Sequence, residues 1–413
     1  MDLKEKLKFY ESAQKPSVKK DSMSQDAGIH LWVEGEEHKN EFGQFYLVKR
    51  SFPKQHQHGS QSLGSNPKLP ESIYAWVGKD AKLQSLNPLK SLYLDTETTG
   101  LAGGAGTVPF MIGLGYFTDN GFNVEQFFMR DYPEERAMLS AFLKRLSEFD
   151  GLVTYNGKCY DVNLIASRLI LHRMEYPITQ LPHLDLLFTA RRLYKRRLSD
   201  CSLGNIEHHI LGFTRHGDVP GFLIPGIYFH YLRSGQGERL KAVFEHNQWD
   251  ILSLAALTMH AGHVYSEPSK ILENTMDWYS LGRAYESLDL NEQAVHCFQK
   301  VVQSGDLSGM EDALYSLGFI YKKKKQWDQA IHCWEQMIKR PFQLLPYEEL
   351  AKYYEHQVRD NEKAMEWVMK ALERIDMQIE LQTNMVLEND RQKLIYRYDR
   401  LKRKLKEMND ENP

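Results

Sequence analysis

Hydrophobic and polar positions from residue 86 onward follow two periods, which distinguish strands from helices. Short apolar runs of about four to eight residues indicate strands, and longer stretches with apolar positions three or four apart indicate helices. Three strands come first, and strands then alternate with helices. The predicted strands are 91–95, 109–117, 123–130, 151–156 and 181–185, and the predicted helices are 133–149, 159–173, 186–197 and 237–260. This order predicts an α/β domain over residues 86–268, with a mixed sheet and helices on both of its faces.

The chain before this domain lacks the same alternation. Residues 1–27 are polar and charged, which predicts a tail. Residues 28–85 predict a small appendage, because two strand-like runs at 29–34 and 42–52 precede a Gly/Ser/Pro-rich linker at 58–67.

After Pro268 the pattern is helical only, and it repeats. The first unit has the tetratricopeptide residues Trp278, Leu281, Gly282, Tyr285, Ala294 and Phe298. The pattern returns at Leu314, Leu317, Gly318, Tyr321, Ala330 and Trp334, and more weakly at Tyr347, Leu350, Ala351, Tyr354, Ala364 and Val368. An ordinary helical bundle is the alternative, but the shared register favours a repeat array over 269–375. Residues 376–413 predict a charged capping helix with a tail.

Composition agrees with a multidomain globular protein. The 413 residues are 42% hydrophobic and 12% aromatic, which is enough for two or three cores. The net charge of −3 excludes a globally basic nucleic-acid coat. The four cysteines form no C-x-x-C pair, so neither a zinc site nor a disulfide scaffold is expected, and a reducing cytoplasm fits best. No apolar run approaches the roughly 18–20 residues of a membrane span, and the N-terminus lacks a signal-peptide pattern, so we expect no membrane partner.

Two acidic residues at the end of the first predicted strand are candidate metal ligands. Side chains of a strand alternate between its faces, so Asp95 and Glu97 in "SLYLDTETTG" point the same way. Like charges this close raise one another's pKa unless a cation lies between them, and Mg²⁺ prefers such oxygen donors. A solvated pair in a turn is the alternative, because so short a motif is common by chance.

Two more acidic residues later in the chain are candidate metal ligands. Asp161 begins a predicted helix that is entered from a strand, and Asp250 lies in the last helix of the domain. Each has a simpler interpretation, since Asp161 also suits a helix N-terminus and Asp250 also suits a solvated helix face. His246 precedes Asp250 by one helical turn on the same face, where a histidine is suited to accept a proton near neutrality.

Three motifs in order carry a family resemblance. They are "DTETTG" at 95–100, "YNGKCYD" at 155–161 and "HNQWD" at 246–250. They resemble the motifs of the DEDD 3′–5′ exonucleases of the ribonuclease H-like fold, and the second is similar to that of the proofreading domains of family-B DNA polymerases. Together with the repeat array, the whole chain resembles the YprB family, predicted bacterial nucleases also described as mitomycin repair factor B.

The resemblance implies that Asp95, Glu97, Asp161 and Asp250 bind two divalent ions, Mg²⁺ or Mn²⁺, and that the reaction is phosphodiester hydrolysis. In the family a histidine general base stands five residues before the last Asp and a tyrosine stands four before it. His246 has the tyrosine spacing. We expect His246 to be the general base, against a histidine that only hydrogen-bonds Asp250 or contacts the substrate backbone.

Substrate contacts are expected in two places. Asn156 and Tyr160 belong to the second motif. The stretch "ARRLYKRR" adds a basic run that suits phosphate contacts, although a solvated basic helix face fits it nearly as well. Its basic residues are Arg191, Arg192, Lys195, Arg196 and Arg197.

Other polar residues have structural interpretations. Asp185 ends a predicted strand, and we favour a capping role for it over metal binding. His56 and His58 have His-x-His spacing, but two histidines alone are more often polar surface residues. His208 and His209 have no acid at ligand spacing, and we interpret them as structural.

Two further stretches carry no catalytic signal. The loop "GLAGGAG" at 100–106 lacks the Lys-Ser/Thr ending of a P-loop, so its glycines indicate a close backbone approach. The lysine-rich stretch 321–325 indicates a solubilising repeat tip.

The expected function is therefore a metal-dependent 3′–5′ exonuclease, with DNA favoured over RNA and repair as the setting that the resemblance implies. The repeats are expected to dock a protein partner, for which a helicase is one candidate. Two alternatives stay open: a scaffold that binds nucleic acid without cutting it, and an RNA-directed nuclease, since nothing in the sequence reads a 2′-hydroxyl. Four mutually repelling carboxylates argue against the scaffold.

Overall fold

A computed structural model describes residues 28–64, 69–70, 72–100, 106–381 and 385–411 of the chain. The predicted tail 1–27 and most of the glycine-rich loop lie outside these residues. The chain divides into two compact units. The sheet unit comprises Met1–Ser65, Asn87–Asp185 and Leu211–Leu257, and the repeat unit comprises Asn66–Leu86, Leu186–Ile210 and Thr258–Pro413.

A mixed sheet of seven strands forms the centre of the described sheet unit, in the order β1-β2-β7-β6-β5-β8-β9. Its strands are β1 (Glu36–Asn40), β2 (Gly43–Pro53), β5 (Ser91–Thr98), β6 (Pro109–Thr118), β7 (Gly121–Phe128), β8 (Gly151–Thr154) and β9 (His183–Asp185). β5 pairs antiparallel with β6 and parallel with β8, and β8 pairs parallel with β9. The predicted meander of three strands and the mixed sheet are both present.

The N-terminal segment belongs to this sheet, whereas the sequence analysis assigned it to an appendage. β2 pairs with β7 along its length, from Tyr46 opposite Phe128 to Pro53 opposite Gly121. The four consecutive apolar residues Phe45–Val48 are buried, so both faces of β2 must be covered, and a place inside a layered domain provides this.

The described part of the predicted linker is packed as well. β3 (Gln57–His58) and β4 (Gln61–Ser62) pair as a small hairpin. Leu63 is buried, and so is His58, which is therefore not the surface histidine that the sequence suggested. The ring nitrogen Nε2 of His58 lies 2.7 Å from Ser253 Oγ, and burial lowers the pKa of His58 to about 3.

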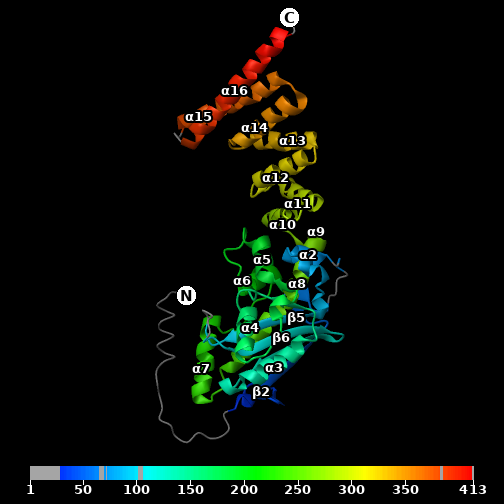
Figure 1. Ribbon diagram of the computed structural model, residues 1–413, viewed down its shortest axis with the longest axis vertical. Helices are drawn as coiled ribbons and strands as arrows, with labels where there is room; N and C mark the ends of the chain where they lie inside the picture. Colours follow the sequence, from blue (N-terminus) through cyan, green and yellow to red (C-terminus); the bar gives the residue numbers. More distant parts are fainter. Residues whose placement is uncertain (1–27, 65–68, 71, 101–105, 382–384, 412–413) are drawn as a thin grey trace. The chain divides into compact units, whose positions relative to one another are not determined.

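Helices cover both faces of the sheet, as predicted (Figure 1). On one face, α3 (Glu135–Leu146) is joined to β7 by Arg145, whose Nε and Nη2 donate to Glu125 at 2.9 Å each. The other face carries α8 (Leu240–Ser266), which continues from the sheet unit into the repeat unit. α4 (Asp161–Leu171) and α7 (Ile224–Ser234) complete the unit, and α7 is a helix that the sequence analysis missed.

Two glycines of β6 let α8 approach the sheet closely. A Cβ atom at Gly113 would lie 2.1 Å from Oδ1 of Asn247, and one at Gly115 would lie 2.4 Å from Cγ2 of Ile251. Real Cβ atoms do not tolerate such distances, so any larger residue here would push the helix away. The spacing of α8 from the sheet is therefore set by "GLG" in the middle of β6.

The repeat unit is almost entirely helical. Its helices are α2 (Ile73–Gly78), α5 (Leu186–Tyr194), α6 (Leu203–Ile206), α9 (Pro268–Ile271), α10 (Thr275–Glu286), α11 (Asn291–Gln303), α12 (Met310–Lys323), α13 (Trp327–Ile338), α14 (Leu344–Tyr353), α15 (Asn361–Leu381) and α16 (Met385–Glu411). The repeat glycines leave room for aromatic rings of the paired helix: a Cβ at Gly282 would lie 2.6 Å from Phe298, and one at Gly318 would lie 2.6 Å from Trp334. This is the physical reason for glycine in the repeat pattern.

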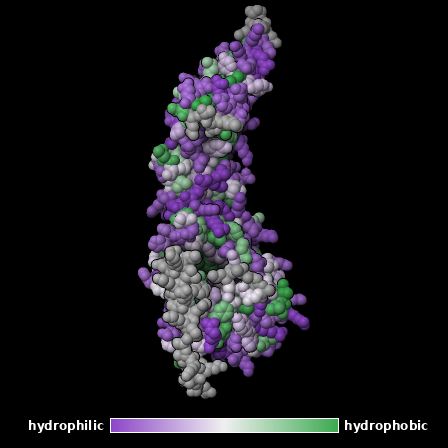
Figure 2. All heavy atoms as spheres, turned by 90° about the vertical axis from the view of Figure 1, so that its left-hand side faces the viewer, coloured by the Kyte–Doolittle hydropathy of each residue, from purple (hydrophilic) through white to green (hydrophobic). Residues whose placement is uncertain are grey.

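The last two helices pack on the end of the array, and their boundary differs from the predicted one: α15 runs past residue 375 to Leu381, and α16 covers most of the region predicted as a single capping helix. Leu394 and Leu401 of α16 are buried in one hydrophobic cluster with α14 and α15. The buried carboxylate of Glu355 accepts hydrogen bonds from Arg400 and Lys404 of α16 at 2.6–2.8 Å. On the face shown in Figure 2, hydrophilic residues predominate over the repeat helices, and hydrophobic ones occur singly or in small groups. None of the described helices is long and apolar enough to span a membrane.

Replacing Gly113 by alanine tests the close packing of α8 on β6. We expect Gly113→Ala to destabilise the protein by about 2–4 kcal/mol, because the new methyl group overlaps Asn247. Denaturant or thermal unfolding measures this change. Gly226→Ala in α7 is the matched control: its Cβ would meet open space, and alanine is the better helix former, so unchanged or slightly higher stability is expected. Equal stability of Gly113→Ala and wild type would contradict the packing described.

Candidate metal centre

Asp95 and Glu97 lie on the same face of β5, as the alternation predicted. Asp95 is paired with Gly113 of β6 and Glu97 with Met111, and the register shifts directly after Glu97. Glu97 is 7% exposed, and Asp95 is half-buried. Both carboxylates therefore lie at the end of a core strand, on the face covered by α8, and not in a solvated turn.

Asp161 is the first residue of α4 and is held by neighbouring polar groups. The hydroxyl of Thr96 on β5 donates to Asp161 Oδ1. The loop before α4 is fixed by Asp185 at the end of β9, which accepts from the backbone N–H of Asn156 at 2.7 Å and of Lys158 at 3.1 Å. Asn156 has φ of +66°, a left-handed conformation that asparagine tolerates. Asp185 thus acts on the backbone of the loop, in line with the capping role expected for it.

His246 and Asp250 face each other one turn apart on α8. Nε2 of His246 lies 3.4 Å from Oδ2 of Asp250. The side chains are 16% and 12% exposed, respectively. Both lie on the sheet side of the helix, where the first two motifs end.

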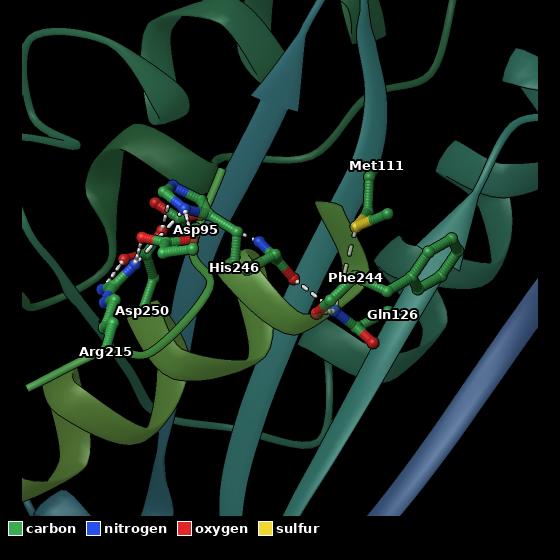
Figure 3. A network of polar contacts seen from close by, with 9 residues as sticks. Asp95, Met111, Gln126, Arg215, Phe244, His246 and Asp250 are labelled. Atoms are coloured by element: carbon green, nitrogen blue, oxygen red, sulfur yellow. Dashed lines mark hydrogen bonds and ion pairs between the residues drawn. The ribbon is translucent and has the colours of Figure 1, made fainter. Parts of the chain in front are cut away.

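A loop before α7 adds two charged residues that the sequence analysis missed. Asp218 binds His246 Nδ1 at 2.7 Å through Oδ1 and Arg215 Nη1 at 3.2 Å through Oδ2. Arg215 also donates to Oδ1 of Asp250. The four residues form a closed ring of alternating charge, Asp218–His246–Asp250–Arg215. Figure 3 shows Arg215, His246 and Asp250 of this ring. No sequence pattern marks this ring, because "TRHGDVP" has the composition of an ordinary polar loop.

A second network fixes Asp95 from the interior (Figure 3). Asn247 is fully buried, and its Nδ2 donates to Asp95 Oδ2 at 2.9 Å. Its Oδ1 accepts from Gln126 of β7 at 3.0 Å, and the same amide of Gln126 donates to the carbonyl of Phe244 at 2.8 Å. A buried amide chain of this kind is satisfied at each step and holds one carboxylate orientation. The sequence hint was an asparagine next to His246, three positions before Asp250.

The carboxylates lie close enough to perturb one another strongly. Burial raises the pKa of Asp95 well above its usual range, and the charges of Asp250, Asp161 and Glu97 raise it further. Burial likewise raises the pKa of Glu97 to about 8 and that of Asp161 to about 6. The four acids predicted from separate motifs are therefore close enough to interact electrostatically, and Glu97 and Asp250 are the two whose ligand atoms lie within 4.8 Å of each other.

His246 compensates part of this negative charge. Burial alone lowers its pKa, but the hydrogen bond to Asp218 and the nearby carboxylates outweigh burial and raise the pKa to about 9. Arg215 contributes a second positive charge beside Asp250. Two cationic side chains thus face the acids from the same side.

The residues present fit a divalent metal ion. Oε1 of Glu97 is buried and has no hydrogen-bond partner among the described residues, a costly state unless a further group binds it. One ligand atom each of Glu97, His246 and Asp250 lie within 4.8 Å of one another. Carboxylate oxygens with one imidazole form a donor set suited to Mg²⁺ or Mn²⁺.

The expected substrate contacts lie in both units. In the sheet unit, Tyr160 is 53% exposed directly before Asp161. In the repeat unit, Arg191 is exposed, whereas Arg192 donates to the carbonyl of Val77 at 2.7 Å. Arg192 thus has a structural contact in addition to the role expected for it.

Two further residues of the basic run bind the first repeats. Arg197 Nε lies 3.0 Å from Asp277 Oδ1 of α10, and Arg196 lies 3.6 Å from Asp312 of α12. This run therefore serves in part to attach α5 to the repeats. His208 and His209 contact each other edge to face.

Sequence comparisons place these features in a known family. The RNase_H superfamily matches residues 92–261, and two tetratricopeptide repeat families match residues 278–304 and 312–341. The "Uncharacterized protein YprB" of Bacillus subtilis (strain 168) is 30% identical over 370 residues, which cover 87% of this chain and 86% of the relative. The chain belongs to the YprB family. The predicted family, the ribonuclease H-like domain and the repeat array are confirmed.

A solved structure also resembles the chain. It is the family B DNA polymerase from the hyperthermophilic archaeon Pyrobaculum calidifontis, with a TM-score of 0.34 and 13% identity. The match covers 48% of this chain and 29% of the polymerase. A likeness this low bears on neither fold nor function, so the YprB relationship rests on the sequence matches.

Repulsion between the carboxylates predicts that the folded, metal-free protein becomes less stable as the pH rises. The raised pKa of Asp95 means that the folded state holds a proton that the unfolded state has lost above about pH 4, so stability falls as pH rises from there towards the folded pKa. We expect Asp95→Asn, which keeps an acceptor for Asn247, to raise the melting temperature at pH 8 by about 3 °C or more. At pH 5 the variant and the wild type are expected to melt alike.

Differential scanning calorimetry in the presence of a chelator measures both temperatures. Asp119→Asn is the control, because Asp119 is an exposed acid in the turn between β6 and β7, and it should change neither. A variant that melts like wild type at pH 8 would show that Asp95 does not carry the strain assigned to it.

Proposed function

We propose that the chain is a metal-dependent 3′–5′ exonuclease that hydrolyses phosphodiester bonds, with DNA as the favoured substrate. The observation that carries the proposal is the meeting of Asp95, Glu97, Asp161 and Asp250 in a ribonuclease H-like domain, where the buried Glu97 Oε1 lacks a partner. A module that only binds nucleic acid gains nothing from four carboxylates that destabilise one another. Metal-assisted hydrolysis uses this arrangement directly.

The four acids are proposed to hold two ions, Mg²⁺ or Mn²⁺. Ions held by these carboxylates would supply the chemistry of an activated water and of charge neutralisation at the leaving oxygen. Asn247 and Thr96 orient Asp95 and Asp161 towards this position. Nε2 of His246 faces Asp250 in the same cluster. By the family resemblance, His246 is proposed to act as the general base that accepts a proton from the attacking water.

Three residues are proposed to bind the substrate. The exposed ring of Tyr160, next to Asp161, suits stacking on a base, which is tolerant of sequence. Asn156 lies in the loop that Asp185 fixes, so its backbone is held at a defined place, and its side chain is proposed as a second contact. Arg191 of α5, which is exposed, is proposed as a phosphate contact.

The repeats are proposed to dock a protein partner, since arrays of this kind present extended surfaces. A helicase that supplies single strands would suit an exonuclease, and repair is the setting proposed for both. Binding of such a partner gives the repeat array a purpose that hydrolysis alone does not require.

End-labelled DNA and RNA of one sequence, each with 3′ and 5′ labels, provide the direct test. With Mn²⁺ or Mg²⁺ we expect DNA to be shortened stepwise from the 3′ end. Asp250→Asn should lower the rate by about 10³-fold or more, because it removes a charged ligand. The exposed-acid control Asp119→Asn should keep the wild-type rate.

Each alternative function predicts a different result in these experiments. Preference for the RNA strand would favour an RNA-directed nuclease. Binding of DNA without any shortening, together with no Mn²⁺ uptake by calorimetry, would favour a scaffold. Wild-type turnover by Asp250→Asn would remove the metal proposal.

A further inference from the structure

His246 is fixed in one orientation by the residue behind it. Its Nδ1 lies 2.7 Å from Oδ1 of Asp218, a distance typical of a good hydrogen bond. A carboxylate accepts, so Nδ1 carries the hydrogen, and Nε2 is the nitrogen turned towards Asp250. A carboxylate behind an imidazole in this way is the arrangement that orients histidine ligands of metals.

The distances in front of the ring suit a shared ion better than a hydrogen bond. Nε2 lies 3.4 Å from Asp250 Oδ2, beyond the usual 2.7–3.2 Å of an N–H···O bond. Two ligands at about 2.1–2.2 Å from one ion, on neighbouring positions, are about 3.0–3.5 Å apart. One ligand atom each of Glu97, His246 and Asp250 lies within 4.8 Å of the other two, and Oε1 of Glu97 has no hydrogen-bond partner among the described residues.

The other oxygen of Asp250 is already used. Arg215 donates to Oδ1 of Asp250, while its Nη1 binds Asp218 at 3.2 Å. Oδ2 is thus the oxygen presented to His246 and Glu97. Arg215 and Asp218 form an outer layer that holds both Asp250 and His246 in place (Figure 3).

We propose that His246 releases the proton on Nε2 to solvent when the ion binds, that Nε2 is then a direct ligand of one metal ion together with Glu97 and Asp250, and that Asp218 is the positioning residue behind it. This deepens the proposed function and rests on it, because it assigns His246 to the ion and not to the proton of the water. Imidazole nitrogen binds Mn²⁺ more readily than Mg²⁺. The centre is therefore expected to bind Mn²⁺ more tightly than Mg²⁺.

Pulsed electron paramagnetic resonance of the full chain with bound Mn²⁺ tests the assignment without relying on turnover. We expect nitrogen modulation from a directly bound imidazole, which changes when the histidines carry ¹⁵N. His246→Gln should abolish the modulation. His216→Gln, an exposed histidine in the same loop as Arg215, is the matched control and should keep it.

Calorimetry adds the affinities. We expect His246→Gln to weaken Mn²⁺ binding by about 10–100-fold and to weaken Mg²⁺ binding much less, and Asp218→Asn to weaken Mn²⁺ binding by about 10-fold or more. Circular dichroism and the melting temperature confirm that the variants are folded. The isotope experiment on the wild type decides the question even if a variant does not fold.

The outcomes separate this assignment from the proposed function. Mn²⁺-dependent shortening of DNA with no nitrogen modulation would overturn the ligand role and return His246 to the water proton, while the exonuclease proposal stands. Absence of Mn²⁺ binding by the wild type would overturn both. Nitrogen modulation with the expected loss in His246→Gln supports the ligand role, whatever substrate the enzyme prefers.

Discussion

Mutual repulsion of acidic side chains in a buried place is the constraint on which the sheet unit depends. Four carboxylates meet at the end of β5, where little water screens them, and burial together with their neighbours raises the pKa of Asp95, Glu97 and Asp161. A fold keeps such a cluster only if cations or protons compensate it. In the metal-free protein, Arg215 and His246 beside Asp250 supply part of the compensating positive charge, and Asp218 holds both of them. Bound divalent ions are proposed to supply the remainder.

The architecture that brings the acids together depends on one close approach. α8 carries His246, Asn247 and Asp250, and it reaches the sheet because Gly113 and Gly115 have no side chains in its path. Asn247 then bonds to Asp95 across this gap and to Gln126 behind it. The same contact thus packs the core and orients a carboxylate. A change in the core at this point is also a change in the site.

The repeat unit uses small residues for a similar purpose. Gly282 and Gly318 leave space for aromatic rings of the partner helix, and the helices stack through these contacts. Two buried carboxylates of this unit have cationic partners: Asp277 binds Arg197, and Glu355 binds Arg400 and Lys404. Arg197, which belongs to the basic run that suggested phosphate binding, is used in this way. A buried carboxylate such as that of Asp277 is costly without a cationic partner, and Arg197 provides one.

Local pattern alone determined the order of strands and helices, the repeat register, and the shared face of Asp95 and Glu97. These properties follow from periods of two and 3.6 residues and from small residues at fixed spacing. Such signals depend only on residues that are close together in the sequence. The three motifs also pointed to Asp161, which begins a helix, and to His246 and Asp250, which lie one turn apart within a single helix. Family membership follows from the same residues.

Tertiary structure decided what lies beyond local pattern. β2 became part of the sheet because its apolar run needs cover on both faces, and His58 became buried through a contact with Ser253, which is 195 positions away in the chain. Arg215, Asp218 and Gln126 could not be found from the sequence for the same reason, and Asn247 was marked only by its place next to His246. Their roles consist entirely of contacts with distant residues, and a polar residue in a loop or helix looks the same whether it faces water or a buried carboxylate.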